Sequence, residues 1–92
     1  MRTFREHERK SDLHGITVMV ETGDGEIWIG RCDDVVEAGV VLRDADVHRE
    51  SEAEPPRAEW LERARRFGVW PRHRHVVVPA VRVTGVRRLA GA

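Results

Sequence analysis

The chain has 92 residues, of which 40% are hydrophobic and 35% charged, and its formal net charge at pH 7 is zero. This length fits one domain rather than two, with a core small enough to make oligomerisation a reasonable expectation. Apolar stretches such as 38–42 and 76–81 are far shorter than the roughly 18 residues of a membrane span, and residues 1–10 are too polar for a signal peptide. A single cysteine excludes an intrachain disulfide and fits a reducing cytoplasm, so we expect a cytoplasmic protein without membrane attachment.

The charges are sorted along the chain despite the zero net charge. Residues 11–56 carry twelve Asp and Glu against three Arg, whereas residues 57–92 carry nine Arg against two Glu. Two surfaces of opposite sign would meet between neighbouring copies, or one of them would hold an anion. The alternative is that the strands interleave in space and average the charges out.

The first half of the chain reads as strands. Residues 1–12 predict a short helix or a frayed tail. Residues 13–43 predict three strands, because apolar and polar side chains alternate from Ile16 onward and again over 26–31, where Trp28 faces away from its apolar neighbours. The segment 22–25 ends in Asp-Gly and predicts a hairpin turn between the first two strands. We expect bends near Gly30 and Gly39 that curl a meander into a small barrel.

An inserted segment, 44–74, separates these strands from the last two. Residues 44–56 are acidic and polar and predict a loop, and a helix is predicted over about 56–67 because Pro56 suits a first helical turn. Its apolar stripe consists of Trp60, Leu61, Ala64 and Phe67. We interpret this stripe mainly as core packing, with docking of a protein partner through Trp60, Leu61 and Phe67 as the alternative.

Residues 75–89 predict the fourth and fifth strands. A strand over 75–78 is followed by a turn at Pro79 and by a second strand that is kinked near Gly85. The whole chain, 1–92, is therefore predicted to be a single, mainly β domain with five short strands and an inserted helix.

The sequence offers little support for catalysis or for a metal or other cofactor. Cys32 has no fixed relation to a histidine that would act as its base, and a small buried side chain is the simpler interpretation. His73 and His75 would share one face of a strand, but a zinc site needs three or four ligands at characteristic spacing. A strand rather than a helix follows the glycines of 23–30, which excludes a phosphate loop. We therefore expect no enzyme.

A longer pattern runs through the first three strands. Leu13-x-Gly15-x-x-Val18-x-Val20, then Gly25-x-Ile27-x-x-Gly30, then Val40-x-Leu42, resembles the first motif of the Sm-like superfamily, which includes the Sm and LSm proteins and bacterial Hfq. The resemblance covers about residues 13–46. It implies a five-stranded, strongly bent antiparallel SH3-like barrel with an amino-terminal helix. The closing motif departs from the family, because Val78-Pro79 stands where the Sm and LSm branch has Arg-Gly, and the long insertion is atypical.

The resemblance also implies assembly and binding sites. It implies a ring in which the fourth strand of one copy pairs with the fifth strand of the next, which would cover two apolar sheet edges. The interface residues would be Val76, Val77, Val78, Val83 and Val86. Single-stranded RNA would bind between subunits near Asp34, Glu37 and Arg82.

Three functional hypotheses follow from these observations. The first is a ring-forming Sm-like protein that binds single-stranded RNA. The second is a scaffolding oligomer that binds no nucleic acid and docks a protein partner through the inserted helix. The third, a metal-dependent enzyme that uses His73 and His75, has the least support.

Overall fold

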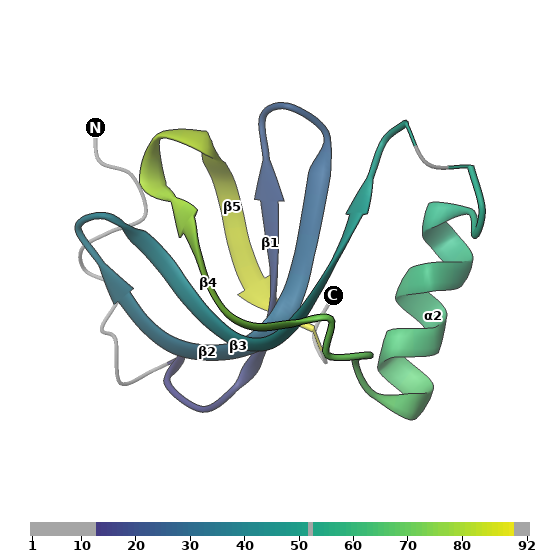
Figure 1. Cartoon of the computed structure of the whole chain (residues 1–92), viewed down its shortest axis with the longest axis horizontal. Helices are drawn as coiled ribbons and strands as arrows, with labels where there is room; N and C mark the ends of the chain where they lie inside the picture. The colour runs from purple at the N-terminus through teal and green to yellow at the C-terminus, as the bar shows by residue number, and fades with distance from the viewer. Residues whose placement is uncertain (1–12, 52, 90–92) are drawn as a thin grey trace.

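The computed structural model describes residues 13–51 and 53–89, which form five strands, one α-helix and one 3-10 helix (Figure 1). The prediction of a mainly β chain with five antiparallel strands and an inserted helix is confirmed. The helix or tail predicted over residues 1–12 lies outside the described residues. The elements are β1 (Thr17–Thr22), β2 (Glu26–Val36), β3 (Gly39–Arg49), α2 (Arg57–Phe67), β4 (His73–Pro79), η1 (Ala80–Arg82) and β5 (Val83–Arg88).

All five strands belong to one sheet in the order β4-β3-β2-β1-β5, and all neighbours are antiparallel. Consecutive strands β1 to β4 are therefore also neighbours in space, whereas β5 returns to pair with β1. The two ends of this row are β4 and β5, and they do not pair with each other. The described part of the chain thus forms an open sheet with two edge strands rather than a closed ladder.

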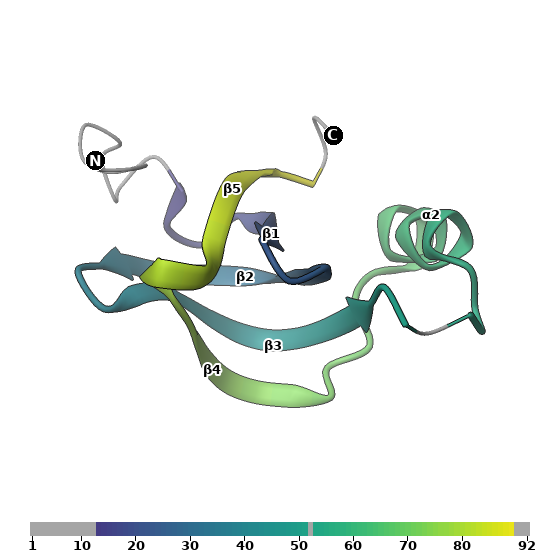
Figure 2. The same cartoon turned by 90° about the horizontal axis from the view of Figure 1, so that it is seen from above.

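The sheet bends strongly in the middle of the pairing between β2 and β3. The pairing register shifts between Ile29 and Arg31, and Gly30 lies at this shift. A Cβ atom at position 30 would lie 2.7 Å from the Cβ of Ala45, which is closer than two carbon atoms can approach. The missing side chain therefore lets the two backbones come together at the bend. Figure 2 shows the resulting curl, from β5 at the top to β4 at the bottom.

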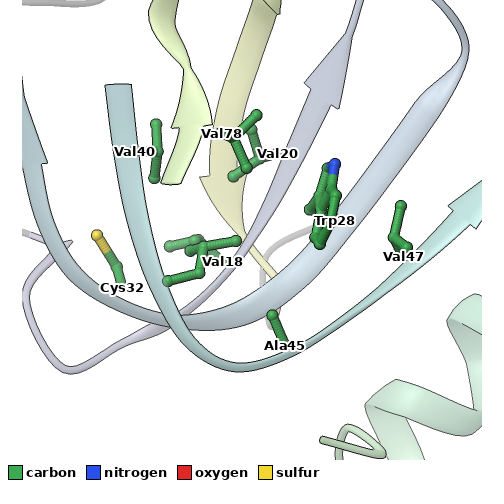
Figure 3. Close-up of a cluster of buried hydrophobic side chains, with 9 residues drawn as sticks. Val18, Val20, Trp28, Cys32, Val40, Ala45, Val47 and Val78 are labelled. Carbon is green, nitrogen blue, oxygen red and sulfur yellow. The ribbon is translucent and has the colours of Figure 1, made fainter. Parts of the chain in front are cut away.

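The curled sheet encloses one apolar core on its inner face (Figure 3). Alternate residues of each strand point into it because side chains alternate between the two faces of a strand. Leu42 and Cys32 are almost fully buried there. The buried members are Val18, Val20, Trp28, Cys32, Val40, Leu42, Ala45, Val47 and Val78.

The outer face of the sheet carries a second apolar cluster, which α2 covers. Met19, Ile27, Ile29 and Leu89 are buried in this cluster, and the helix packs Trp60, Leu61 and Ala64 against it. Both faces of the β1–β2 hairpin are therefore buried, which explains why Met19, Ile27 and Ile29 are as apolar as the inner residues. The stripe on α2 has the core-packing role that the sequence favoured, except for Phe67, which is 81% exposed.

Two strand boundaries differ from the sequence prediction. The second strand is longer than the alternating residues 26–31, because β2 continues through Asp33 and Asp34 to Val36 and the chain reverses only at 37–38. The predicted loop over 44–56 begins six residues later than expected, because β3 continues to Arg49. The side chains at the end of β3 alternate between the two faces of the sheet. Ala45 and Val47 face the inner core, whereas Asp46 and His48 are buried on the side of α2. The acidic composition of this segment concealed that alternation.

Among the described residues, no helix has the length and apolar character needed to cross a membrane.

Candidate functional site

Arg82 is turned toward carboxylates of the β1–β2 hairpin. Its Nη2 donates hydrogen bonds to Oδ2 of Asp24 at 2.9 Å and to Oε1 of Glu26 at 2.5 Å. Glu26 also accepts hydrogen bonds from the Trp28 indole at 3.0 Å and from Arg49 at 3.1 Å. The positive charge of Arg82 is therefore balanced within the chain by two carboxylates.

The pKa values of these two carboxyl groups reflect the same contacts. Burial pushes the pKa of Glu26 upward, but the hydrogen bonds from Trp28 and Arg82 outweigh it, and the pKa lies below its usual value. A hydrogen bond from the Thr22 hydroxyl holds the pKa of Asp24 below its usual value, and the positive charge of Arg82 lowers this pKa further. Both groups are consequently ionised at neutral pH, which keeps the Arg82 contacts charged on both sides.

The 3-10 helix η1 brings the turns of two hairpins together. The backbone N–H of Ala80 donates to the carbonyl of Ala38 at 2.9 Å, and the N–H of Gly23 donates to the carbonyl of Arg82 at 3.0 Å. Glu37 precedes Ala38 in the exposed β2–β3 turn, so this turn contacts the short helix that carries Arg82. Asp34 lies near the end of β2, where its Oδ1 accepts the N–H of Val35.

The five valines predicted for a subunit interface lie on the two edge strands. Val78 is buried in the inner core, and Val76, Val83 and Val86 pack against that core. Val77 faces outward and is 41% exposed. Four of the five side chains thus pack against the inner core of their own chain. The two edge strands present mainly their backbone and the Val77 side chain to solvent.

The backbone amides of Val77 and Val86 point away from the sheet. The N–H of Ala80 donates to the carbonyl of Ala38, and β4 continues the same register, with Val78 opposite Val40 and Val77 opposite Val41. Val78 therefore directs its N–H and C=O toward β3, as Ala80 does, whereas Val77 is out of phase with both. In an antiparallel ladder, every second residue directs its N–H and C=O away from the partner strand. On β5, the N–H of Leu89 donates to the carbonyl of Thr17, and this bond sets the alternation along the strand. The backbone N–H and C=O of Val86 consequently point away from β1. Among the described residues, Val77 and Val86 therefore present backbone donors and acceptors that no neighbouring strand of the sheet pairs.

A pocket of about 510 Å³ lies between α2, the sheet and the segment that follows the helix. Ile29 of β2 and Asp46 of β3 contribute to it from the sheet, and Trp60 contributes from α2. Phe67 and Trp70, which are 81% and 72% exposed, also line it. The sequence analysis did not single out this pocket or Asp46. The signal for it in the sequence was the concentration of large aromatic residues in the inserted segment, which includes Trp70 just beyond the end of the helix.

Asp46 is a buried carboxylate in the pocket wall, with 6% of its surface exposed. Its Oδ1 accepts the N–H of Val47 at 2.8 Å, and its Oδ2 accepts the indole N–H of Trp60 at 3.1 Å. Arg72 Nε lies 3.7 Å from Oδ1. These contacts compensate for the burial of the charge and hold the carboxylate in one orientation.

His48 lies beside Trp60 and fixes the chain that leads into the helix. Its Nε2 is 2.8 Å from the carbonyl oxygen of Pro55, and its ring centroid is 5.3 Å from that of Trp60. Since a carbonyl oxygen only accepts hydrogen bonds, Nε2 carries the proton in this contact. Arg57 ties the start of α2 to the β1–β2 turn by donating to the carbonyl of Gly25 at 2.8 Å. Polar contacts as well as apolar packing therefore position the pocket.

The residues considered for catalysis or metal binding lie apart from this pocket. Cys32 is in the inner core, where burial, followed by the charges of Asp34 and Asp33, raises the pKa of its thiol to about 11. His73 contacts the edge of the Trp28 ring, with 5.1 Å between the ring centroids. Within 13–51 and 53–89, no three His, Cys, Asp or Glu side chains come together as metal ligands would.

Comparison of the sequence with models of protein families and with curated proteins finds no match.

Proposed function

We propose that this chain is a self-assembling Sm-like module whose copies join through the two open edges of the sheet. The observation that carries the proposal is the strand order β4-β3-β2-β1-β5, which leaves β4 and β5 as separate edges of one strongly bent sheet. This is the arrangement that the resemblance in residues 13–46 implies for head-to-tail pairing of the fourth and fifth strands. The description of the bent sheet as an Sm-like barrel and the closure of the copies into a ring are both parts of this proposal.

The chemistry of the edges supports this assembly. An exposed edge strand with free N–H and C=O groups is a template for pairing with another chain. Here the outward amides of Val77 and Val86 lie on opposite edges of the same molecule, so that one copy's β4 complements another copy's β5. A heterologous contact of this kind closes into a ring when the rotation between copies permits it. The valine side chains that pack against the inner core would hold both edge strands in place for pairing.

The geometry favours assembly over RNA binding between subunits as the function of this chain. The guanidinium of Arg82 is balanced by Asp24 and Glu26, which reduces its attraction for a phosphate. Asp34 and Glu37, the other two residues of the expected binding site, are acidic. RNA between subunits is accordingly not part of the proposal.

The outward amide at position 77 allows a sharp test. A Val77→Pro substitution removes an N–H that faces the open edge and leaves the ladder between β3 and β4 its hydrogen bonds. Val77→Thr is the matched control, because it keeps the amide and a β-branched side chain. We expect light scattering to show that Val77→Thr retains the mass of the wild-type assembly and that Val77→Pro dissociates into smaller, folded species. If Val77→Pro stays folded and keeps the wild-type mass, pairing through β4 is refuted.

A further inference from the structure

The two edge strands that the proposed assembly would join are both basic. His73, Arg74 and His75 lie at the start of β4, and Arg87 and Arg88 lie at the end of β5. Neither strand contains an acidic residue. Because like charges on neighbouring strands oppose pairing, the charge state of these residues affects how readily the two edges join.

The backbone of His75 faces the open edge of β4. His75 lies two residues before Val77, and the register of β4 on β3 runs without interruption between them. Since every second residue of an antiparallel strand directs its N–H and C=O to the same side, those of His75 point away from β3, as those of Val77 do. The His75 side chain is exposed. A strand added at this edge would therefore pair directly with His75.

Antiparallel pairing of β4 with β5 of the next copy would bring an arginine to His75. When Val77 lies opposite Val86 of the next copy, the residue opposite His75 is Arg88, because the two strands run in opposite directions. A register two residues away in either direction keeps Arg88 diagonal to His75, which is still within reach of a long side chain. The approach of the two side chains thus follows from the direction of the strands and does not depend on a single register.

The charged groups around His75 within its own chain are mainly basic. Arg74 precedes it on β4, and Arg43 lies opposite it on β3. The carboxylate that β2 contributes here is that of Asp33, whose Oδ1 lies 3.3 Å from Nε of Arg43. This acidic group is therefore already part of an ion pair with an arginine.

The next copy would add Arg88 and Arg87 from its β5 and Glu21 from its β1. Glu21 already forms an ion pair with Arg87, with 3.1 Å between Oε2 and Nη2. The carboxylates on both sides of the joint are thus paired with arginines of their own chain. A protonated His75 would therefore lie close to arginines on both sides of the joint.

We propose that protonation of His75 separates the copies, so that the assembly dissociates in mild acid. Histidine is the side chain that ordinarily gains its charge between about pH 8 and pH 5. In a separate chain the proton on His75 is exposed to water, whereas in the assembly it would lie beside Arg88 of the next copy. The assembled state therefore binds fewer protons, and by linkage a fall in pH favours the separate chains. This inference rests on the pairing of β4 with β5 proposed above.

Light scattering of the full chain at about pH 7.5 and about pH 5.5 tests this switch, with circular dichroism to monitor folding. For the wild type, we expect the concentration at which half of the chains are assembled to rise about fivefold in acid, the effect of a like-charge pair across two strands. High salt should reduce this rise because it screens exposed charges. His75→Gln keeps a polar side chain but cannot be protonated, and it should assemble equally at both pH values.

Two further variants separate this switch from a general effect of acid on the protein. His14→Gln is the matched control, because His14 is exposed but lies outside both edge strands, and it should respond to acid as the wild type does. Arg88→Gln removes the charge that His75 would meet, and it should lose most of the acid response.

The outcomes distinguish failure of the switch from failure of the assembly. The switch is overturned if the wild type keeps its assembled mass unchanged at both pH values, or if His75→Gln separates in acid as readily as the wild type. In both of these cases the pairing of β4 with β5 still stands. A wild type that remains a single chain at both pH values overturns the strand pairing and this inference together.

Discussion

The indole N–H of Trp60 donates a hydrogen bond to the buried carboxylate of Asp46 at 3.1 Å, which joins α2 to the outer face of the sheet. The two residues are 14 positions apart and lie on elements that the sequence separates by an acidic loop. This contact orients the carboxylate in the pocket wall while the indole ring packs on the apolar cluster. The inserted helix is thus a structural part of the domain.

Replacement of Trp60 by phenylalanine should show the contribution of that hydrogen bond. Trp60→Phe keeps an aromatic ring but leaves Asp46 with one donor fewer, and loss of a partner to a buried charged group costs about 1–3 kcal/mol in the free energy of unfolding. Urea denaturation measures the loss. Trp70→Phe, at an exposed position, is the control and should remain within about 0.5 kcal/mol of the wild type. Equal stability of the two variants would contradict the anchoring role of Trp60.

Glu26 should make the stability of the fold depend on acid pH. Since the pKa of Glu26 in the folded chain lies below its ordinary value of 4.5, the ionised group stabilises the fold above that pH. The stabilisation is lost as the pH falls through the lowered pKa. We therefore expect Glu26→Gln to be less stable than the wild type at neutral pH, with a difference that shrinks in acid. Denaturation curves across this range measure it, with Glu37→Gln, in an exposed turn, as the control. A difference that stays constant with pH would contradict the account.

Cys32 should be chemically inert in the folded protein. Its thiol is buried, and a pKa of about 11 leaves almost no reactive thiolate at neutral pH. We expect iodoacetamide to label the native chain far more slowly than the chain in denaturant. Because the folded pKa is raised, the wild type should also lose stability as the pH rises from 9 to about 11, a loss that Cys32→Ala should not show. Rapid labelling of the native protein would disprove this burial.

Gly39 should be indispensable for the pairing of β3 with β4. Its φ angle is +153°, and a Cβ atom there would lie 2.0 Å from the carbonyl oxygen of Val78. Gly39→Ala must therefore separate the two strands, and we expect a loss of at least about 3 kcal/mol in thermal or urea unfolding. Gly68 is the matched control, because its φ is also positive but no atom lies within 4 Å of the added Cβ. Gly68→Ala should cost only about 1 kcal/mol of backbone strain. Similar losses in both variants would refute the steric argument.

The elements that the sequence predicted well are those with a local signal. The β1–β2 hairpin has strict alternation around an Asp-Gly turn, and α2 has an apolar stripe between Pro56 and Gly68. The end of β3 was missed because Asp46 and His48 made a buried strand look like a polar loop. Their burial depends on α2, which lies farther along the chain.

The sites were harder to predict because they depend on contacts between distant residues. Arg82 pairs with Asp24 and Glu26, which are 58 and 56 positions away, and no local pattern reveals that its charge is balanced. The pocket likewise depends on Asp46 of β3 and Trp70, which follows α2, lining the same cavity.

The mass of the untagged wild-type protein in solution tests self-assembly most directly. Light scattering over a range of protein concentrations should give one discrete mass, a fixed multiple of the 10.5 kDa chain, because a closed ring has no edge left to extend. A constant mass of 10.5 kDa up to the highest concentration would contradict the proposal that β4 and β5 of successive copies pair.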